Sequence, residues 1–163
     1  MHLRSVGERS MLWALLCLVF SQLSWGQSCE STLTVVKNRH TRTVTSEDPT
    51  RFYLQLTNHS DQVQEYLLSV DVGPDSCSLG DLESERRTDP DLFTTTWKTS
   101  QNSANRVLVQ PGQSESISML VSLRQTLSRA SWQCITVKAQ SKQCSSNSHI
   151  NLRLWMEPDQ SDN

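Results

Sequence analysis

The chain has 163 residues, the length of one domain with a hydrophobic core of its own. Its 15 lysines and arginines stand against 17 aspartates and glutamates, which gives a formal net charge of −2 at pH 7. Proteins that bind nucleic acid or anionic membranes carry an excess of positive charge, so both are disfavoured as partners.

Residues 1–26 have the three parts of a signal peptide: the polar "MHLRSVGERS", the apolar "MLWALLCLVF" and the exit "SQLSWG". We expect cleavage after Gly26. A lipid anchor on Cys29 is the less favoured alternative, because "GQS" is a poor lead-in for it. The apolar run is shorter than the roughly 20 residues of a membrane span, and no later stretch approaches that length. The sequence therefore predicts export to the periplasm, the cell surface or the medium, without membrane insertion after cleavage.

Four cysteines remain after cleavage: Cys29, Cys77, Cys134 and Cys144. An even number in an oxidising compartment predicts two disulfides. A zinc site is the rival interpretation. It is weaker, because no two of these cysteines are two to four residues apart and the histidines at 40, 59 and 149 are scattered.

Strand patterns dominate the chain after residue 31, and no window has a helical period. In chain order we expect strands at 32–36, 51–58, 63–72, 93–97, 106–109, 114–123, 132–139 and 149–156. "NHSD" predicts a hairpin turn between the second and third strands, and Pro111-Gly112 predicts a tight reversal before 114–123. Residues 73–93 break the period and are expected to form a long loop.

Seven or eight short strands separated by turn residues predict an all-β fold, an immunoglobulin-like antiparallel β-sandwich. The domain is expected to cover 27–156, followed by a polar tail at 157–163. The side chains predicted to face the core include Ile117, Met119, Val121, Leu123, Ile135, Val137, Ile150, Leu152 and Leu154.

If the strands follow immunoglobulin-like order, Cys29 and Cys144 lie at one end of the sandwich, and Cys77 and Cys134 at the other. Disulfide partners need α-carbons within about 7 Å, so this geometry favours Cys29 with Cys144 and Cys77 with Cys134. Sequence alone leaves the other connectivities open.

The order of "FYLQLTNHSDQVQEYLLSV", a tryptophan-bearing strand, "VLVQPGQSESISMLVSL" and "CITVKAQS" resembles a family of bacterial immunoglobulin-like domains. These are the alpha-galactosidase-associated and cell-adhesion-related (CARDB-like) domains of secreted glycosidases and surface proteins. The match covers about residues 50–141. It implies a non-catalytic spacer or binding module. The four cysteines and the long charged segment 73–93 depart from the family pattern.

No nucleophile motif, phosphate loop, paired metal ligands or dinucleotide fingerprint is present, so we expect neither a cofactor nor catalysis. The acidic residues between Asp71 and Asp91 raise the alternative of a calcium site, but their spacing matches no calcium loop. We interpret the segment as solvated. In its sharper form the hypothesis is that it presents charge to a protein partner, through Asp81, Glu83, Glu85, Arg86 and Arg87.

Trp132 is placed on the strand face opposite Ile135 and Val137, so it is a candidate for partial exposure and for partner binding. Exposed tryptophans also stack on sugars, which makes a carbohydrate-binding module the alternative. Core or rim packing is the simpler explanation for Trp97, Trp132 and Trp155. "KNRH" with Arg42 forms a small basic patch, which we interpret as a solvated turn rather than a polyanion site.

Two further features have competing interpretations. Asn58 in "NHS" matches the glycosylation acceptor pattern, whereas the structural interpretation makes it a turn residue bonded to nearby backbone. The stretch 149–156 is a candidate edge strand.

The sequence as a whole predicts an exported, non-catalytic protein-interaction or accessory module. A carbohydrate-binding module is the alternative, and a small secreted hydrolase is the third hypothesis.

Overall fold

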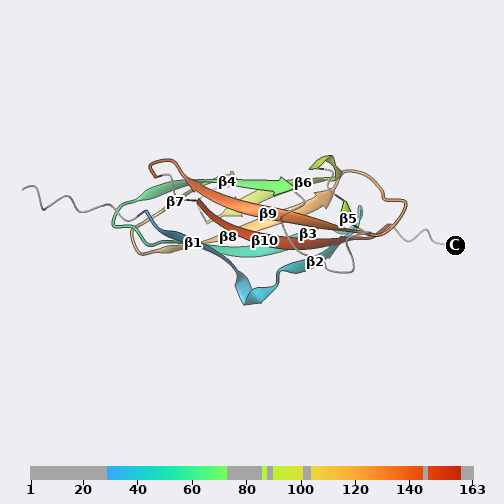
Figure 1. Cartoon of the computed structure of the whole chain (residues 1–163), viewed down its shortest axis with the longest axis horizontal. Helices are drawn as coiled ribbons and strands as arrows, with labels where there is room; N and C mark the ends of the chain where they lie inside the picture. Colours follow the sequence, from blue (N-terminus) through green and yellow to red (C-terminus); the bar gives the residue numbers. More distant parts are fainter. Residues whose placement is uncertain (1–28, 73–85, 88–89, 101–103, 145–146, 159–163) are drawn as a thin grey trace, which may run out of the picture.

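The computed structural model describes residues 29–72, 86–87, 90–100, 104–144 and 147–158. These residues form two stacked β-sheets along one elongated body (Figure 1). Sheet A has the strand order β1-β3-β8-β6, and all of its pairings are antiparallel. Its strands are β1 (Ser31–Val35), β3 (Thr50–Asn58), β6 (Phe93–Thr99) and β8 (Ser114–Leu123).

Sheet B has the strand order β2-β10-β9-β4-β7, and the short β5 also pairs with β9. Its strands are β2 (Thr41–Val44), β4 (Gln64–Val72), β5 (Arg86–Arg87), β7 (Arg106–Val109), β9 (Ser131–Ser141) and β10 (Asn147–Met156). Two 3₁₀ turns complete the described elements, η1 (Val36–Asn38) and η4 (Pro90–Leu92).

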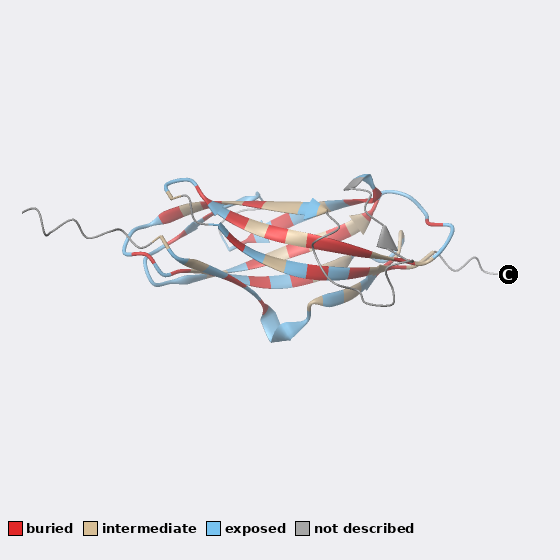
Figure 2. Ribbon diagram, in the orientation of Figure 1, coloured by how far each residue is buried: buried red, intermediate tan, exposed pale blue. Residues whose placement is uncertain are grey.

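Alternating side chains build the core between the sheets. In β3, Phe52, Leu54 and Leu56 are fully buried, whereas Tyr53 and Gln55 between them are exposed. Figure 2 shows the same alternation as bands of buried and exposed residues along the strands. The predicted core residues all lie in or against this core: Ile117, Met119, Val121, Leu123, Ile135, Val137, Leu152 and Leu154 are buried, and Ile150 is partly buried.

The predicted strand count was too low. The described residues contain nine strands of four or more residues, besides the two-residue β5. The sequence pattern missed β2 and β5, since neither is long enough to show a period. Both pair in parallel, β2 with β10 and β5 with β9, so the sandwich is not wholly antiparallel.

Two predicted reversals do not form hairpins. Strands β3 and β4 belong to different sheets, and so do β7 and β8. The Pro111-Gly112 turn does form, with Gly112 at φ +65° and the Gln113 N–H donating to the Gln110 carbonyl at 3.1 Å. This turn carries the chain from β7 in sheet B to β8 in sheet A. Both strands bury alternate residues in the core between the sheets.

The stretch 149–156 is not the edge strand that the sequence suggested. As β10 it lies between β9 and β2, and Arg153–Met156 pairs with Thr41–Val44. The short β2 therefore covers the backbone that the sequence left open, which removes a free edge from the last strand.

Asn58 is the centre of a buried polar cluster where β3 ends and the chain crosses to sheet B. Its side chain is fully buried, and its Nδ2 donates to the carbonyls of Gln62 (2.7 Å) and Val109 (3.0 Å). Its Oδ1 accepts from the Ser60 N–H (3.0 Å), the Ser60 hydroxyl (2.7 Å) and the Tyr66 hydroxyl (3.4 Å). Burial raises the pKa of Tyr66, which keeps this phenol protonated as a donor. The geometry supports the structural interpretation of Asn58, because a glycan on Nδ2 is incompatible with these bonds.

One predicted disulfide, Cys29–Cys144, is present, with α-carbons 5.9 Å apart. It joins the residues before β1 to the loop after β9, so it ties sheet A to sheet B at one end of the sandwich. Cys134 is also disulfide-bonded. Its predicted partner Cys77 lies outside the described residues, so that pairing stays a prediction. In the described ranges, no helix is long and apolar enough to cross a membrane.

Replacing both Cys29 and Cys144 with serine should lower the free energy of unfolding by about 2–5 kcal/mol. The bridge closes a loop with a sequence separation of 115 residues, and opening it restores that entropy to the unfolded chain. Urea titration followed by circular dichroism measures the loss. An unchanged midpoint would contradict the stabilising role of this bridge.

Asn58→Ala should lower the free energy of unfolding by about 2–4 kcal/mol, because each buried group left without a hydrogen bond costs roughly 1–3 kcal/mol. Gln55→Ala is the matched control, since Gln55 is exposed on the same strand and its loss should stay within about 0.5 kcal/mol. Equal free energies of unfolding for the two variants would show that the polar cluster around Asn58 does not stabilise the connection from β3 to β4.

Candidate partner-binding surface

The outer face of sheet B carries Trp132, the tryptophan singled out from the sequence. In β9 the side chains of Ile135, Val137 and Ala139 face the core, so the alternation turns Trp132 outward. Trp132 is half-buried, which agrees with the partial exposure expected of it. Trp97 differs, because it is buried in the core from β6.

Trp132 packs against Trp155 of the neighbouring β10. The two residues are direct cross-strand partners, their ring centroids lie 4.9 Å apart, and the ring planes are tilted by 49°. Trp155 Nε1 donates a hydrogen bond of 2.7 Å to Glu157 Oε1, which fixes the second ring. The strands thus hold two large aromatic side chains side by side at the surface, in an arrangement that aromatic pairs prefer.

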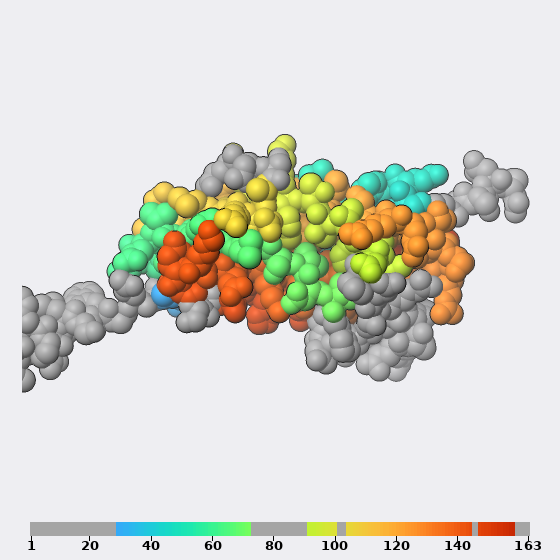
Figure 3. Space-filling model, turned by 90° about the horizontal axis from the view of Figure 1, so that it is seen from above, coloured from blue at the N-terminus to red at the C-terminus, as the bar shows by residue number. Residues whose placement is uncertain are grey.

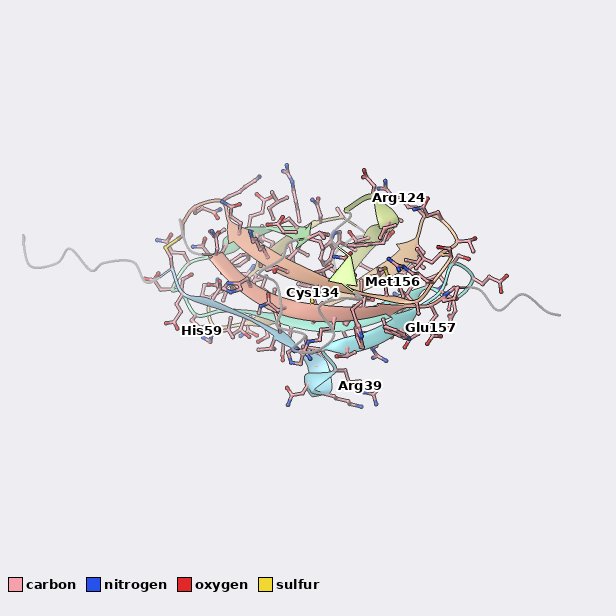
Figure 4. The ribbon with its side chains drawn as sticks, turned by 45° about the vertical axis from the view of Figure 1, so that its right-hand side comes forward. Arg39, His59, Arg124, Cys134, Met156 and Glu157 are labelled. Carbon is pink, nitrogen blue, oxygen red and sulfur yellow. A yellow bond between two sulfur atoms is a disulfide. The ribbon has the colours of Figure 1, made fainter. Side chains whose placement is uncertain are left out.

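The charged segment returns to the sheet beside this pair. In β5, Arg86 is the register partner of Trp132, and Arg87 that of Gln133. Figure 4 shows the short β5 arrow close to Cys134, which is fully buried and disulfide-bonded one residue further along β9. The backbone of two predicted partner-binding residues, Arg86 and Arg87, therefore lies beside β9 at the position of a third, Trp132.

The acidic candidates cannot be placed in the same way. Asp81, Glu83 and Glu85 lie outside the described residues. The backbone of β5 shows only that the chain carrying them rejoins sheet B next to Trp132. We name the surface formed by Trp132, Trp155 and the β5 backbone the tryptophan surface.

Further along the same face, exposed charged side chains form ion pairs. Lys138 pairs with Asp71, and Glu65 pairs with Lys142 (2.8 Å) and Arg106 (3.7 Å). The hydrogen bond from Lys142, together with the charges of Lys142 and Arg106, lowers the pKa of Glu65 below its ordinary value. Such exposed pairs stabilise a fold little, and with three cations against two anions they leave one positive charge in excess. The tryptophan surface differs from this group of ion pairs in its two packed aromatic rings.

The histidines are separated. The ring of His59 lies 2.8 Å from Thr32 Oγ1 at the exposed end of β3, and His40 Nδ1 lies 3.4 Å from the Asn151 carbonyl. His149 is exposed on β10, opposite Lys138. Across the ranges that the structure describes, no group of three or more His, Cys, Asp or Glu side chains is placed to share a metal ion.

Sequence reasoning missed a cleft of about 510 Å³ between the two sheets, where β4 of sheet B faces β6 of sheet A. Figure 3 views this side, with the atoms of β4 in green and those of β6 in yellow-green. The lining includes Val70, Val72, Phe93 and Arg124. The cleft forms because β4 and β6 belong to different sheets. The sequence pattern did not indicate to which sheet each strand belongs.

Coupling between the two tryptophans is measurable. A double-mutant cycle with Trp132→Ala and Trp155→Ala should give an interaction free energy of about 0.5–1.5 kcal/mol, the usual value for an aromatic pair. Unfolding in urea of the parent, both single variants and the double variant supplies the four stabilities. Losses that simply add, within about 0.3 kcal/mol, would contradict the packing of the two rings.

Comparison with known proteins bears on the fold alone. No protein-family model matches the chain, and no curated protein matches it. A FixG-related protein from Vibrio parahaemolyticus is similar at 17% identity, over 78% of this chain and 94% of its own, with a TM-score of 0.49. The PapD-like domain 7 of human CEP192 is similar at 13% identity, over 80% of this chain and 87% of its own, with a TM-score of 0.45.

A family 123 glycoside hydrolase from Clostridium perfringens is similar at 5% identity and a TM-score of 0.50, over 80% of this chain and 27% of its own. At sequence identities this low, structural similarity supports a similar fold but gives no evidence of a shared activity. The chain is an all-β sandwich of two sheets, and its structural neighbours include domains of the immunoglobulin-like and PapD-like kind.

Proposed function

We propose that this chain is an exported, non-catalytic protein-interaction module that contacts its partner through the tryptophan surface. The observation that carries the proposal is the half-buried Trp132–Trp155 pair, held by adjacent strands beside the β5 backbone. Tryptophan is enriched among the few residues that dominate binding energy at protein interfaces. A rigid sheet that carries such anchors loses little conformational entropy on binding.

The charged segment adds a second element to the proposed interface. It leaves sheet B after Val72 and rejoins it at Arg86, and the disulfide-bonded Cys134 lies between the two attachment points on β9. Segments held by a rigid scaffold commonly carry binding residues. We propose that a Cys77–Cys134 bridge fixes this segment, so that Asp81, Glu83 and Glu85 can act together with Trp132.

We also propose a cellular location and a family relation for this module. A location in the periplasm or at the cell surface fits an exported chain with a disulfide between its sheets. A relation to the alpha-galactosidase-associated and cell-adhesion-related domains implies an accessory role, as the resemblance over residues 50–141 suggests. Carbohydrate binding is the competing function, because the same pair of aromatic rings could stack on a sugar.

A capture experiment tests the proposal. The purified chain, Trp132→Ala and the control Leu108→Ala are immobilised and exposed to an extract of the source cell envelope. Leu108 is an exposed apolar residue of β7 in the same sheet, away from the two tryptophans in the strand order. We expect a defined protein partner, identified by mass spectrometry, whose captured amount falls at least about tenfold with Trp132→Ala and is unchanged with Leu108→Ala.

The outcomes separate the competing functions. Capture of equal amounts of the partner by the parent and by Trp132→Ala would contradict the proposal that the tryptophan surface binds it. Binding on a glycan array that disappears with Trp132→Ala would favour the carbohydrate-binding module instead.

A further inference from the structure

A second surface lies where the chain crosses from sheet A to sheet B between β1 and β2. Here η1 projects from the long side of the molecule (Figure 1), and Arg39 lies on this projection (Figure 4). Lys37 and Asn38 both have positive φ values, 59° and 52°, which residues other than glycine rarely adopt. Such backbone conformations are frequent at binding sites, which makes the projection a candidate site for a ligand.

A pocket of about 180 Å³ lies beside this projection. It is lined by Val35, Val36, Lys37, Arg39, Arg42 and Tyr53. Three of the six lining side chains are cationic. Pockets for drug-sized ligands measure roughly 300–1,000 Å³, so this one fits a small charged group better than a large organic molecule.

Arg42 is the least expected of these cations. It is placed on the same face of β2 as Val44, which is buried, and opposite Leu154 of β10, which is fully buried. The strand alternation therefore directs its guanidinium toward the gap between the sheets. Its Nε is buried and has no hydrogen-bond partner. A buried donor on a charged group normally has an acceptor, and leaving it without one is costly.

Several other cations of the described surface have polar partners. Arg106 and Lys142 pair with Glu65, and Lys138 pairs with Asp71. Arg51 Nη1 donates to Ser118 Oγ at 2.8 Å. In contrast, Lys37, Arg39 and Arg42 form no ion pair within the described part of the chain, although they line one pocket.

We propose that this pocket binds a divalent tetrahedral oxyanion, a sulfate or phosphate group, with Arg42 Nε as its buried donor. Lys37 and Arg39 add two further positive charges to the lining, and Tyr53, a 52% exposed residue of sheet A, completes the pocket. Arginine matches such oxyanions particularly well, because its N–H groups form a fixed fork. The inference is independent of the proposed function, since the pocket shares no residue with the tryptophan surface.

The Nε–H signal of Arg42 in ¹⁵N NMR spectra reports on the proposed bond directly. Its assignment follows from its loss in Arg42→Lys. The purified chain is titrated with sodium sulfate, and sodium chloride keeps the ionic strength constant so that general screening does not change. We expect this signal to shift and to saturate. An Arg42 signal that stays unmoved, or that drifts linearly without saturation, overturns the proposal.

Variants assign the binding to the pocket, with the backbone amide signals of Val36–Arg39 as the common readout. Arg42→Met keeps an unbranched apolar stem but removes the guanidinium, and it should weaken sulfate binding at least about tenfold, the usual effect of losing a charge-assisted hydrogen bond. Lys37→Gly removes a charge while fitting the positive φ, so it tests the pocket even if Arg42→Met folds poorly. The control Arg129→Ala removes an exposed charge from the β8–β9 loop and should change nothing. Equal weakening by Arg129→Ala would overturn the assignment.

The probe series then identifies the source of the anion. Inorganic sulfate, inorganic phosphate, a sulfated disaccharide and acetate are compared under the same conditions. Tighter binding of the sulfated disaccharide than of inorganic sulfate supports a sulfate ester as the ligand, and equal binding supports the free ion. Acetate that binds as tightly as sulfate would overturn the assignment to a divalent oxyanion.

Discussion

The structure depends on one constraint: strands of two different sheets must bury alternate side chains in a single layer of apolar contacts. Phe52, Leu54 and Leu56 from sheet A meet residues such as Ile135 and Val137 from sheet B in this layer. Because every second residue is committed to the core, the remaining side chains are displayed outward at regular intervals. The tryptophan pair is exposed for that reason, and Arg42 is drawn inward for the same reason.

The local effect of this constraint, the alternation of buried and exposed residues along each strand, could be predicted from the sequence. The strand periods and the core residues follow from alternation, and the structure agrees with them. The Cys29–Cys144 bridge was favoured only by assuming an immunoglobulin-like strand order, and it is present. Sheet membership does not follow, because a turn such as Pro111-Gly112 serves a hairpin and a crossing between sheets equally well. The four residues of β2 were missed since "TRTV" carries too short a period, and its pairing with β10 depends on contacts more than 100 residues apart.

The candidate sites divide in the same way. The outward direction of Trp132 could be predicted from its position relative to Ile135, but its packing on Trp155 requires the register of β9 with β10. The pocket at Arg42 was interpreted as a solvated turn, because a charge in a short polar stretch resembles a surface loop. Only the pairing of Arg42 opposite the buried Leu154 reveals that its guanidinium is partly withdrawn from water.

The parallel pairing of β5 has a consequence for how this protein can change. Val72 and Arg86 attach to the same strand, at Ile135 and Trp132, only three positions apart. Because the two attachment points are so close together on β9, the strand pairings on either side do not depend on how many residues connect them. Doubling such a connection costs only about 0.6 kcal/mol in closure entropy. The sequence and length of this connection can therefore change without altering the pairings of β9, provided that a cysteine remains to bond with Cys134.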